Sequence, residues 1–222
     1  MAGLKVADRA RIAGLFADGA KRTAVANALA SPLLRWRYSS AATGEILIVP
    51  QDLRLSDPSF LGEIELGEYG LAGRHASAGD RSPFDIAPPS PQWQHELHGF
   101  SWLRHLDADD TPAASEMARK LVMDWMDRHA AGVNSADTPD VSARRIISWI
   151  SNAHVILDNA SDAQYERFIH SFARQLPHIA ARWRNAAAGL PRLTCVISLC
   201  MGNLALGGYD RQLPEAIKRL ED

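Results

Sequence analysis

The sequence has little cysteine and no excess of charge of either sign. Its two cysteines, Cys195 and Cys200, are too few for the disulfide framework of a secreted domain. Five residues apart on one predicted helix, they point in different directions, so we expect two buried free thiols. The 24 Lys and Arg residues against 26 Asp and Glu give a formal net charge of −2. This balance excludes nucleic-acid binding that is driven mainly by a net positive charge.

Long apolar runs are also absent. No stretch reaches the ~18 uncharged apolar residues of a membrane span, and no unbroken apolar run follows a basic start as in a signal peptide. Residues 190–206 come nearest, but a proline, an arginine and a glycine interrupt them. They predict a core helix buried on every side. We therefore expect a cytoplasmic protein, or a periplasmic one if the true start lies elsewhere.

Motifs of common catalytic and metal sites are lacking as well. His95 and His98 are three residues apart, whereas a zinc-protease helix places its histidines four apart with a glutamate between them. His105 is too loosely spaced to be a convincing third ligand. The chain has neither a glycine-rich phosphate loop nor a nucleophile elbow. We expect no metal and no cofactor.

By composition the chain has three parts: residues 1–40, 41–90 and 91–222. Residues 1–40 are basic and rich in alanine, and their spacing predicts an amphipathic helical segment. Such a helix packs on its own domain or, as a less favoured alternative, lies on a membrane surface. Residues 41–90 hold a short apolar strand at 45–49, then closely spaced glycines and prolines. They predict an extended wrapping segment with little strand.

Residues 91–222 predict a train of paired antiparallel helices, so the expected fold class is mainly α. A capping residue followed by proline opens helices at Pro91 and Pro112. Apolar residues continue the first of these at helical spacing to Leu106.

The later helices have start and stop signals of their own. Asp140 is expected to cap a helix that continues through Leu157. Residues 161–164 fit a capping box for the next helix, which Pro177 should kink or break.

Tryptophans on the helical train lie near arginines and histidines in the sequence. A guanidinium holds a carboxylate or sulfate through paired hydrogen bonds, and tryptophan faces stack on sugar rings, so such a groove suits an acidic polysaccharide. The competing interpretation is that helical proteins bury tryptophan as core. The candidate binding residues are Arg81, in an exposed turn, and His98, Trp102, Arg104, Arg144, Arg145 and Trp149 on the helices.

Several separated segments carry a resemblance to a known family. They are residues 53–60 (LRLSDPSF), 79–84 (GDRSPF), 97–106 (LHGFSWLRHL), 139–149 (PDVSARRIISW) and 189–193 (GLPRL). In this order they resemble the N-terminal half of bacterial heparinase II/III family proteins. The resemblance covers nearly the whole chain from residue 45 onward.

The resemblance implies an (α/α) toroid, here incomplete, which a C-terminal antiparallel β-sandwich follows in the family. Characterised members are polysaccharide lyases that cleave uronic-acid polymers by β-elimination. A base removes the proton at C5, neutralising groups hold the carboxylate, and a tyrosine protonates the leaving oxygen. In the family these residues come from later helices and from the sandwich. The tyrosines at 38, 69, 165 and 209 match no catalytic position, so we expect this chain alone to be inactive.

Three hypotheses of function follow. The first is the toroid portion of a lyase that binds a uronate-containing polysaccharide. The second is a non-catalytic helical module that docks a partner chain. An incomplete toroid leaves an apolar face uncovered on its last helices, at residues 193–220, which would bind the β-sandwich or a second copy. The third, less favoured, is a membrane-surface protein that uses its basic N-terminal helix.

Overall fold

The computed structural model describes residues 44–57, 59–109, 111–129 and 138–221. The chain divides into two compact units, Met1–Ser40 and Ala41–Asp222, and every element described below belongs to the second. The predicted amphipathic helix of residues 1–40 lies outside the described residues. Among the described helices, none combines the length and the apolar character needed to cross a bilayer.

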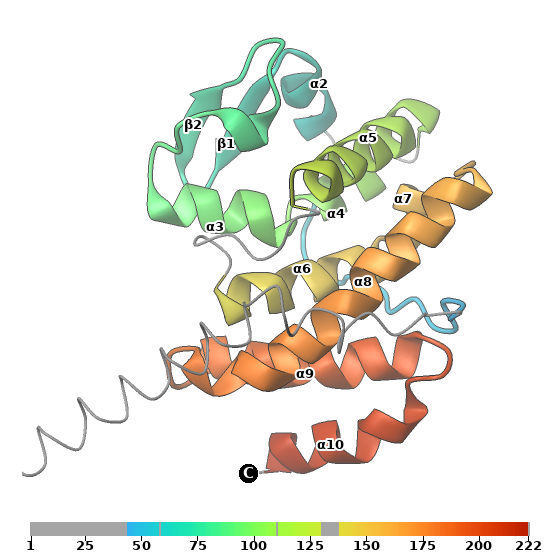
Figure 1. Ribbon diagram of the computed structural model, residues 1–222. Helices are drawn as coiled ribbons and strands as arrows, with labels where there is room; N and C mark the ends of the chain where they lie inside the picture. The colour runs from blue at the N-terminus through green and yellow to red at the C-terminus, as the bar shows by residue number, and fades with distance from the viewer. Residues whose placement is uncertain (1–43, 58, 110, 130–137, 222) are drawn as a thin grey trace, which may run out of the picture. The chain divides into compact units, whose positions relative to one another are not determined.

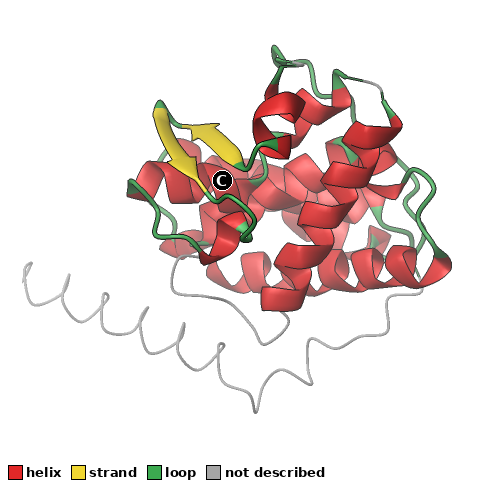
Figure 2. Cartoon of the chain, turned by 90° about the horizontal axis from the view of Figure 1, so that it is seen from above, coloured by secondary structure: helices red, strands yellow, loops and turns green. Residues whose placement is uncertain are grey.

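The described residues are mainly helical, as predicted, with one small antiparallel hairpin (Figures 1 and 2). The first half contains α2 (Phe60–Glu65), β1 (Glu68–Leu71), β2 (Arg74–Ser77), η2 (Pro83–Asp85), α3 (Pro91–Gly99), α4 (Leu103–Asp107) and α5 (Pro112–His129). The second half contains α6 (Pro139–Ser151), α7 (Ala153–Leu157), α8 (Asp162–Arg182), η3 (Trp183–Asn185), α9 (Leu190–Ala205), η4 (Asp210–Gln212) and α10 (Leu213–Glu221).

The elements of this unit stack in a fixed order around α6. The hairpin contacts α3, α3 packs on α6, α6 packs on α9, and α9 packs on α10, as Figure 1 shows from top to bottom. The helix α8 also packs against both α6 and α9. Because α6 has neighbours on several sides, most of its side chains are buried.

An aromatic cluster forms the centre of the core. The ring of Trp149 on α6 meets Phe100 and Trp125 edge-on, with centroids 5.6 and 5.5 Å away. Phe168 on α8 lies 5.3 Å from Trp149 on another side. Such edge-to-face pairs add to the stabilisation that burial of the rings provides. The core therefore joins α3, α5, α6 and α8 through large rings.

The segment before α2 is extended, and the expected strand at 45–49 is reduced to one bridge, between Ile46 and Leu206. The Leu47 N–H donates to the Ala205 carbonyl at 2.7 Å. Further along, the Asp57 N–H donates to Nδ1 of His105 at 2.8 Å. The hairpin β1–β2 supplies the strands instead. The segment thus runs between the end of α9 and α4.

The helix boundaries differ from expectation at several positions. Phe100 takes a left-handed conformation (φ 56°), which ends α3 and separates it from α4. Thr138 rather than Asp140 is the N-cap of α6, and α6 ends at Ser151, with Asn152 as its C-cap, instead of continuing to Leu157. The predicted capping box of α8 is present. Pro177 does not break α8, because the buried face around Leu176 and Ile179 holds the helix despite one lost backbone bond.

The apolar helix α9 is not buried on every side. Leu193 and Leu204 are 44% and 47% exposed, and Ile217 and Leu220 on α10 are exposed to a similar extent. The helix α9 packs on α6, α8 and α10, and Leu193 and Leu204 remain partly exposed beside these contacts. We call Leu193, Leu204, Ile217 and Leu220 the apolar patch.

Candidate functional site

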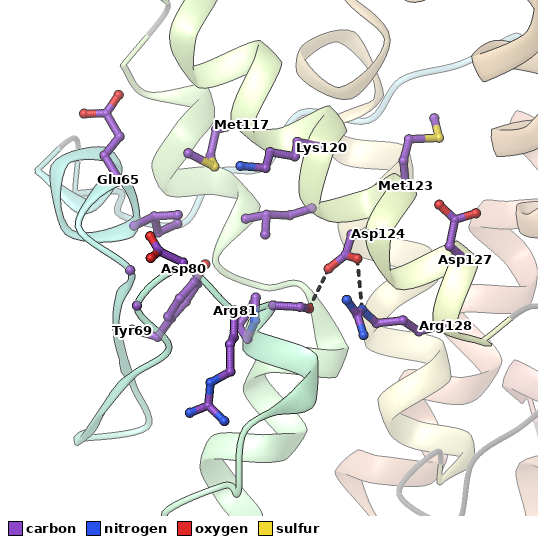
Figure 3. Close-up of a pocket in the computed structure, with 16 residues that line it drawn as sticks. Glu65, Tyr69, Asp80, Arg81, Met117, Lys120, Met123, Asp124, Asp127 and Arg128 are labelled. Atoms are coloured by element: carbon purple, nitrogen blue, oxygen red, sulfur yellow. Dashed lines mark hydrogen bonds and ion pairs between the residues drawn. The ribbon is translucent and has the colours of Figure 1, made fainter.

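A cavity of about 610 Å³ lies between the hairpin region and α5 (Figure 3). One wall comes from the end of α2, from β1 and from the turn at residues 79–83. The other wall is the face of α5 between Met117 and Arg128. A volume of this size is typical of small-molecule and saccharide sites. The turn at residues 79–83, which lines this cavity, belongs to one of the segments that resemble the heparinase II/III family.

The turn at residues 79–84 is fastened to α5 by hydrogen bonds and an ion pair. The Ser82 hydroxyl donates to Oδ2 of Asp124 at 2.6 Å and accepts from the Phe84 N–H. Arg128 donates to Oδ1 of Asp124 at 2.9 Å and also pairs with Asp85. Figure 3 shows the two bonds to Asp124 as dashed lines. Because both partners of the turn sit on one helix, the turn is held in a defined position.

Two glycines close the hairpin side of the cavity. Gly67 has φ +73°, and a Cβ atom built there would lie 2.5 Å from the Gly79 carbonyl oxygen. The Ala78 N–H donates to the Gly67 carbonyl at 2.8 Å, which draws the two ends of the hairpin together. Only glycine has both the freedom and the size for this close approach. Gly67 therefore sets the position of the chain that leads into the turn.

Tyr69 lies in the same wall, with its ring buried against the protein. Burial raises the pKa of Tyr69 to about 12, and the nearby carboxylate of Asp124 adds to the rise. Trp93 donates its indole N–H to the Tyr69 carbonyl at 3.1 Å and fixes the backbone. At neutral pH the phenol is therefore uncharged and serves as a hydrogen-bond donor and acceptor.

The cavity wall also carries charged groups without partners. Four of them make no hydrogen bond or ion pair with another described residue: Arg81, Lys120, Glu65 and Asp80. In the view of Figure 3, Lys120 projects from α5 toward the hairpin side, where Asp80 and Tyr69 lie, while the side chains of Arg81 and Glu65 extend away from the other lining groups. These groups are the ones that a polar ligand would meet.

Of the residues expected to bind a ligand, Arg81 alone lines this cavity. Arg104 donates from Nε to the Leu55 carbonyl at 3.0 Å, and Arg144 pairs with Glu96 at 3.3 Å. Both of these side chains are partly exposed and hold neighbouring segments in place.

The remaining expected residues lie in the core. Trp102 and Trp149 are 2% and 0% exposed, so protein atoms cover the ring faces that were expected to stack on a sugar. Arg145 is buried with its guanidinium 4.0 Å from the Trp125 ring, and it donates to the His98 carbonyl. The structure brings His98 and Arg145 together, but as part of the packing between helices. These side chains are buried because α3, α5, α6 and α8 pack together around the aromatic rings.

Reasoning from the sequence missed Lys120, Tyr69 and Asp124. Lys120 and Asp124 lie one helical turn apart, and this spacing alone is common on exposed helix faces. Tyr69 stands in a glycine-rich stretch that was expected to be extended. The useful signal was the polar turn at 79–84, whose exposed Arg81 had been expected to bind a ligand.

The histidines and cysteines form no second site in the described part of the chain. No group of three or more His, Cys, Asp or Glu side chains there is placed to hold a metal ion. Cys195 and Cys200 are both free, but only Cys195 is buried, and burial raises its pKa to about 12. A thiol with so high a pKa carries little thiolate and is a poor nucleophile.

Comparison with known proteins gives one informative relative. FtsZ-localized protein C of Caulobacter vibrioides (strain NA1000 / CB15N) is 33% identical over 133 residues. The match covers 59% of this chain and 23% of that protein, so the chain matches about a quarter of the relative's length. No family model matches the chain, and no solved structure matches it.

Proposed function

We propose that this chain is the N-terminal, saccharide-binding portion of a heparinase II/III-like protein, with the helices of an incomplete (α/α) toroid. Its ligand is a uronate-containing polysaccharide, bound in the cavity between the hairpin and α5. The observation that carries the proposal is Arg81, an unpaired cation on a turn that Ser82 and Asp124 fasten beside the cavity. The turn is held in place, and the exposed Arg81 guanidinium can bind a carboxylate through paired hydrogen bonds.

The surroundings of Arg81 favour a saccharide over other acidic ligands. A saccharide combines carboxylates with many hydroxyl groups, and the wall offers both cations and hydroxyl acceptors. Lys120 supplies a second cation, while Tyr69 and Asp80 supply groups that exchange hydrogen bonds with hydroxyls. The order of helical pairs and the segments that resemble the family add support from the sequence.

The proposal gives this portion a role in binding rather than in bond cleavage. β-Elimination requires a base poised to remove a proton at the working pH. Tyr69, with a pKa of about 12, stays protonated at neutral pH and is suited to donating a hydrogen bond to bound sugar. Where the whole protein cleaves polysaccharide, we assign that chemistry to a part beyond these helices.

The test is calorimetric titration of the chain with a mixed pool of short uronate oligosaccharides. Removing one unpaired cation, in Arg81→Gln or Lys120→Gln, should weaken binding by about 1–2 kcal/mol, that is, roughly 5- to 30-fold. Arg74→Gln is the matched control, because Arg74 is exposed on β2 and does not line the cavity. Equal binding by all three variants and the parent would reject the site.

A second assay examines chemistry directly. The unsaturated uronate product of β-elimination absorbs in the ultraviolet, so turnover can be followed by absorbance. We expect no product from this chain. Product formation that disappears in Tyr69→Phe would show that the chain carries its own base, contrary to the proposal.

The apolar patch on α9 and α10 favours a second candidate function, docking of a partner chain. Leu193 and Leu204 are large apolar side chains of α9 in contact with solvent. Large apolar side chains left exposed on two adjacent helices favour an interaction surface there. The relative's name describes localization with FtsZ, so we propose that this surface recruits the protein to sites of cell division.

This second proposal has its own test. A fluorescent fusion of the chain should co-localise with FtsZ in a bacterium that divides with it, and Leu193→Ser with Leu204→Ser should disperse the signal. Leu55→Ser is the control, because Leu55 is fully exposed but lies outside the apolar patch. Unchanged localization in the double variant would exclude the patch as the docking surface.

A further inference from the structure

A smaller cavity, of about 270 Å³, lies among the last helices and shares no residue with the cavity beside α5. Its helices are α8, α9 and α10, and α9 packs on the other two at the lower end of the stack in Figure 1. Apolar contacts come from Ala180, Leu199 and Ala216. The polar lining residues are Asn203, Arg211, Gln212, Glu215 and Arg219. This lining combines a small apolar surface with groups that bind a polar ligand.

Asn203 is the buried polar group of this cavity. The residue is only 4% exposed, and its Oδ1 atom has no hydrogen-bond partner among the described residues. A buried carboxamide without a partner costs free energy, and folded proteins leave few such groups unsatisfied. The oxygen and nitrogen of a carboxamide exchange places by rotation about one bond, so the side chain can donate or accept. A ligand in the cavity would supply the partner that Asn203 lacks.

The charged groups of this cavity leave one cation unmatched. Arg219 donates from Nε to Oε1 of Glu215 at 3.3 Å, one helical turn away on α10. Arg211 on η4 makes no hydrogen bond or ion pair with another residue in the described part of the chain. Both Arg211 and the adjacent Gln212 are exposed, so the cavity is open to solvent on the side of η4. A single free guanidinium there suits a singly charged carboxylate, which it binds through two parallel hydrogen bonds.

We propose that this cavity binds a small ligand that carries an amide next to a carboxylate. The carboxylate lies against Arg211, and the amide exchanges a hydrogen bond with Asn203, while Leu199 contacts a short aliphatic side chain. The volume is slightly below the ~300 Å³ at which pockets for drug-sized ligands begin, so the ligand is small. A free N-acyl amino acid and the last residue of a peptide chain share this chemistry. The proposal is independent of saccharide binding beside α5.

The experiment is calorimetric titration of the whole chain with four probes. They are N-acetylalanine, propanoate, which lacks the amide, N-acetylalanine amide, which lacks the carboxylate, and inorganic phosphate. We expect N-acetylalanine to bind about tenfold more tightly than each of the others, because it alone satisfies both polar groups. In NMR spectra, N-acetylalanine should also shift the side-chain amide signal of Asn203, and propanoate should not.

Variants test the two polar contacts separately. Asn203→Leu removes a buried polar group without a partner, so the melting temperature should stay the same or rise while N-acetylalanine binds about tenfold more weakly. Arg211→Gln changes an exposed side chain and should weaken binding by a similar factor. Lys218→Gln is the matched control, because Lys218 is an exposed cation on α10 that does not line the cavity. If Asn203→Leu does not fold, Arg211→Gln and the NMR shift still test the site.

Weaker binding in the Asn203 and Arg211 variants, with unchanged binding in Lys218→Gln, supports the proposal. Trialanine with a free carboxylate then identifies the source of the ligand: binding as tight as that of N-acetylalanine assigns the end of a peptide, and weaker binding assigns a free small molecule. Equal binding of N-acetylalanine and propanoate overturns the proposal, as does tighter binding of phosphate. The absence of N-acetylalanine binding to the folded chain also overturns it.

Discussion

The cavity region and the α9–α10 region differ in the side chains at their surfaces. Around the cavity, charged side chains bind one another across elements, as Asp124 binds both Ser82 and Arg128. Along α9 and α10, large apolar side chains such as Leu193 and Leu204 reach solvent. Polar contacts fix geometry, and exposed apolar area favours association. The contrast places a network of polar contacts at one end of the stack of helices and solvent-exposed apolar side chains at the other.

Both regions depend on the same aromatic core, so its loss should have the largest effect. Trp149→Ala removes a fully buried ring that contacts Phe100, Trp125 and Phe168. We expect the free energy of unfolding to fall by about 3–5 kcal/mol, measured by urea denaturation. Trp149→Phe should cost less, because the Trp149 indole N–H has no hydrogen-bond partner among the described residues.

This variant also tests the interpretation of Trp149 as a sugar-stacking residue. A stable Trp149→Ala protein that has lost saccharide binding would favour stacking and would contradict the burial seen here.

The hairpin side of the cavity should be the next most sensitive. Gly67→Ala adds a Cβ atom against the Gly79 carbonyl at a positive φ, and we expect a loss of about 2–3 kcal/mol. Gly73→Ala is the matched control, because Gly73 has a similar φ but open space around it, and it should cost about 1 kcal/mol. Equal losses in urea denaturation would show that the close approach to Gly79 is unimportant.

The attachment of the turn to α5 comes third. Asp124→Ala leaves Ser82 and Arg128 without their shared acceptor, and we expect a loss of about 1–3 kcal/mol. Asp127→Ala on the same helix removes an exposed ion pair with Arg167 and should cost at most about 0.5 kcal/mol. If thermal denaturation ranks the two variants the other way, the turn is held by something else.

The extended segment that runs between the two regions should respond to pH. Burial lowers the pKa of His105, and the neighbouring Arg104 lowers it further. Because the folded pKa lies below the unfolded value of about 6.5, the unfolded state binds more protons between the two values. The stabilisation by neutral His105, which accepts from the Asp57 N–H, is therefore present above that window and is lost as the pH falls through it.

Urea denaturation between about pH 7 and pH 5 measures this effect against His105→Gln, which has no titrating group there. We expect stability to fall more steeply with acid in the parent than in the variant. Parallel curves would show that the bond to Asp57 contributes nothing.

The smallest effect on stability is expected at the apolar patch. Leu193→Ser with Leu204→Ser changes side chains that are nearly half exposed, so the free energy of unfolding should change by about 0.5 kcal/mol or less per site. Urea denaturation of the double variant measures this change. A large loss of stability would mean that these leucines belong to the core and not to a docking surface.

Much of the helical architecture was predictable because its signals are local. Capping residues and prolines at Pro91, Pro112 and Ser161 mark helix starts by satisfying backbone groups within one turn. Breaks at Phe100 and Asn152 were not predictable, since each depends on how the following helix packs.

The candidate site was predictable only in part. Arg81 stood out because it lies in a polar turn with proline and glycine, which is a local signal. Lys120 and Tyr69 are far from it in the sequence and join it through folding alone. Trp149 illustrates the opposite error, since a tryptophan beside two arginines looks like a ligand site until the neighbouring helices cover it.

The sequence by itself determined that the chain is mainly helical, where most helices begin, and that two cysteines remain free, because these depend on spacing and on hydrogen bonds within a turn. The tertiary structure alone decided which aromatic rings are core, which charges remain unpaired beside the cavity, and which leucines reach solvent. Burial and pairing are properties of neighbours in space, and helices distant in sequence supply those neighbours.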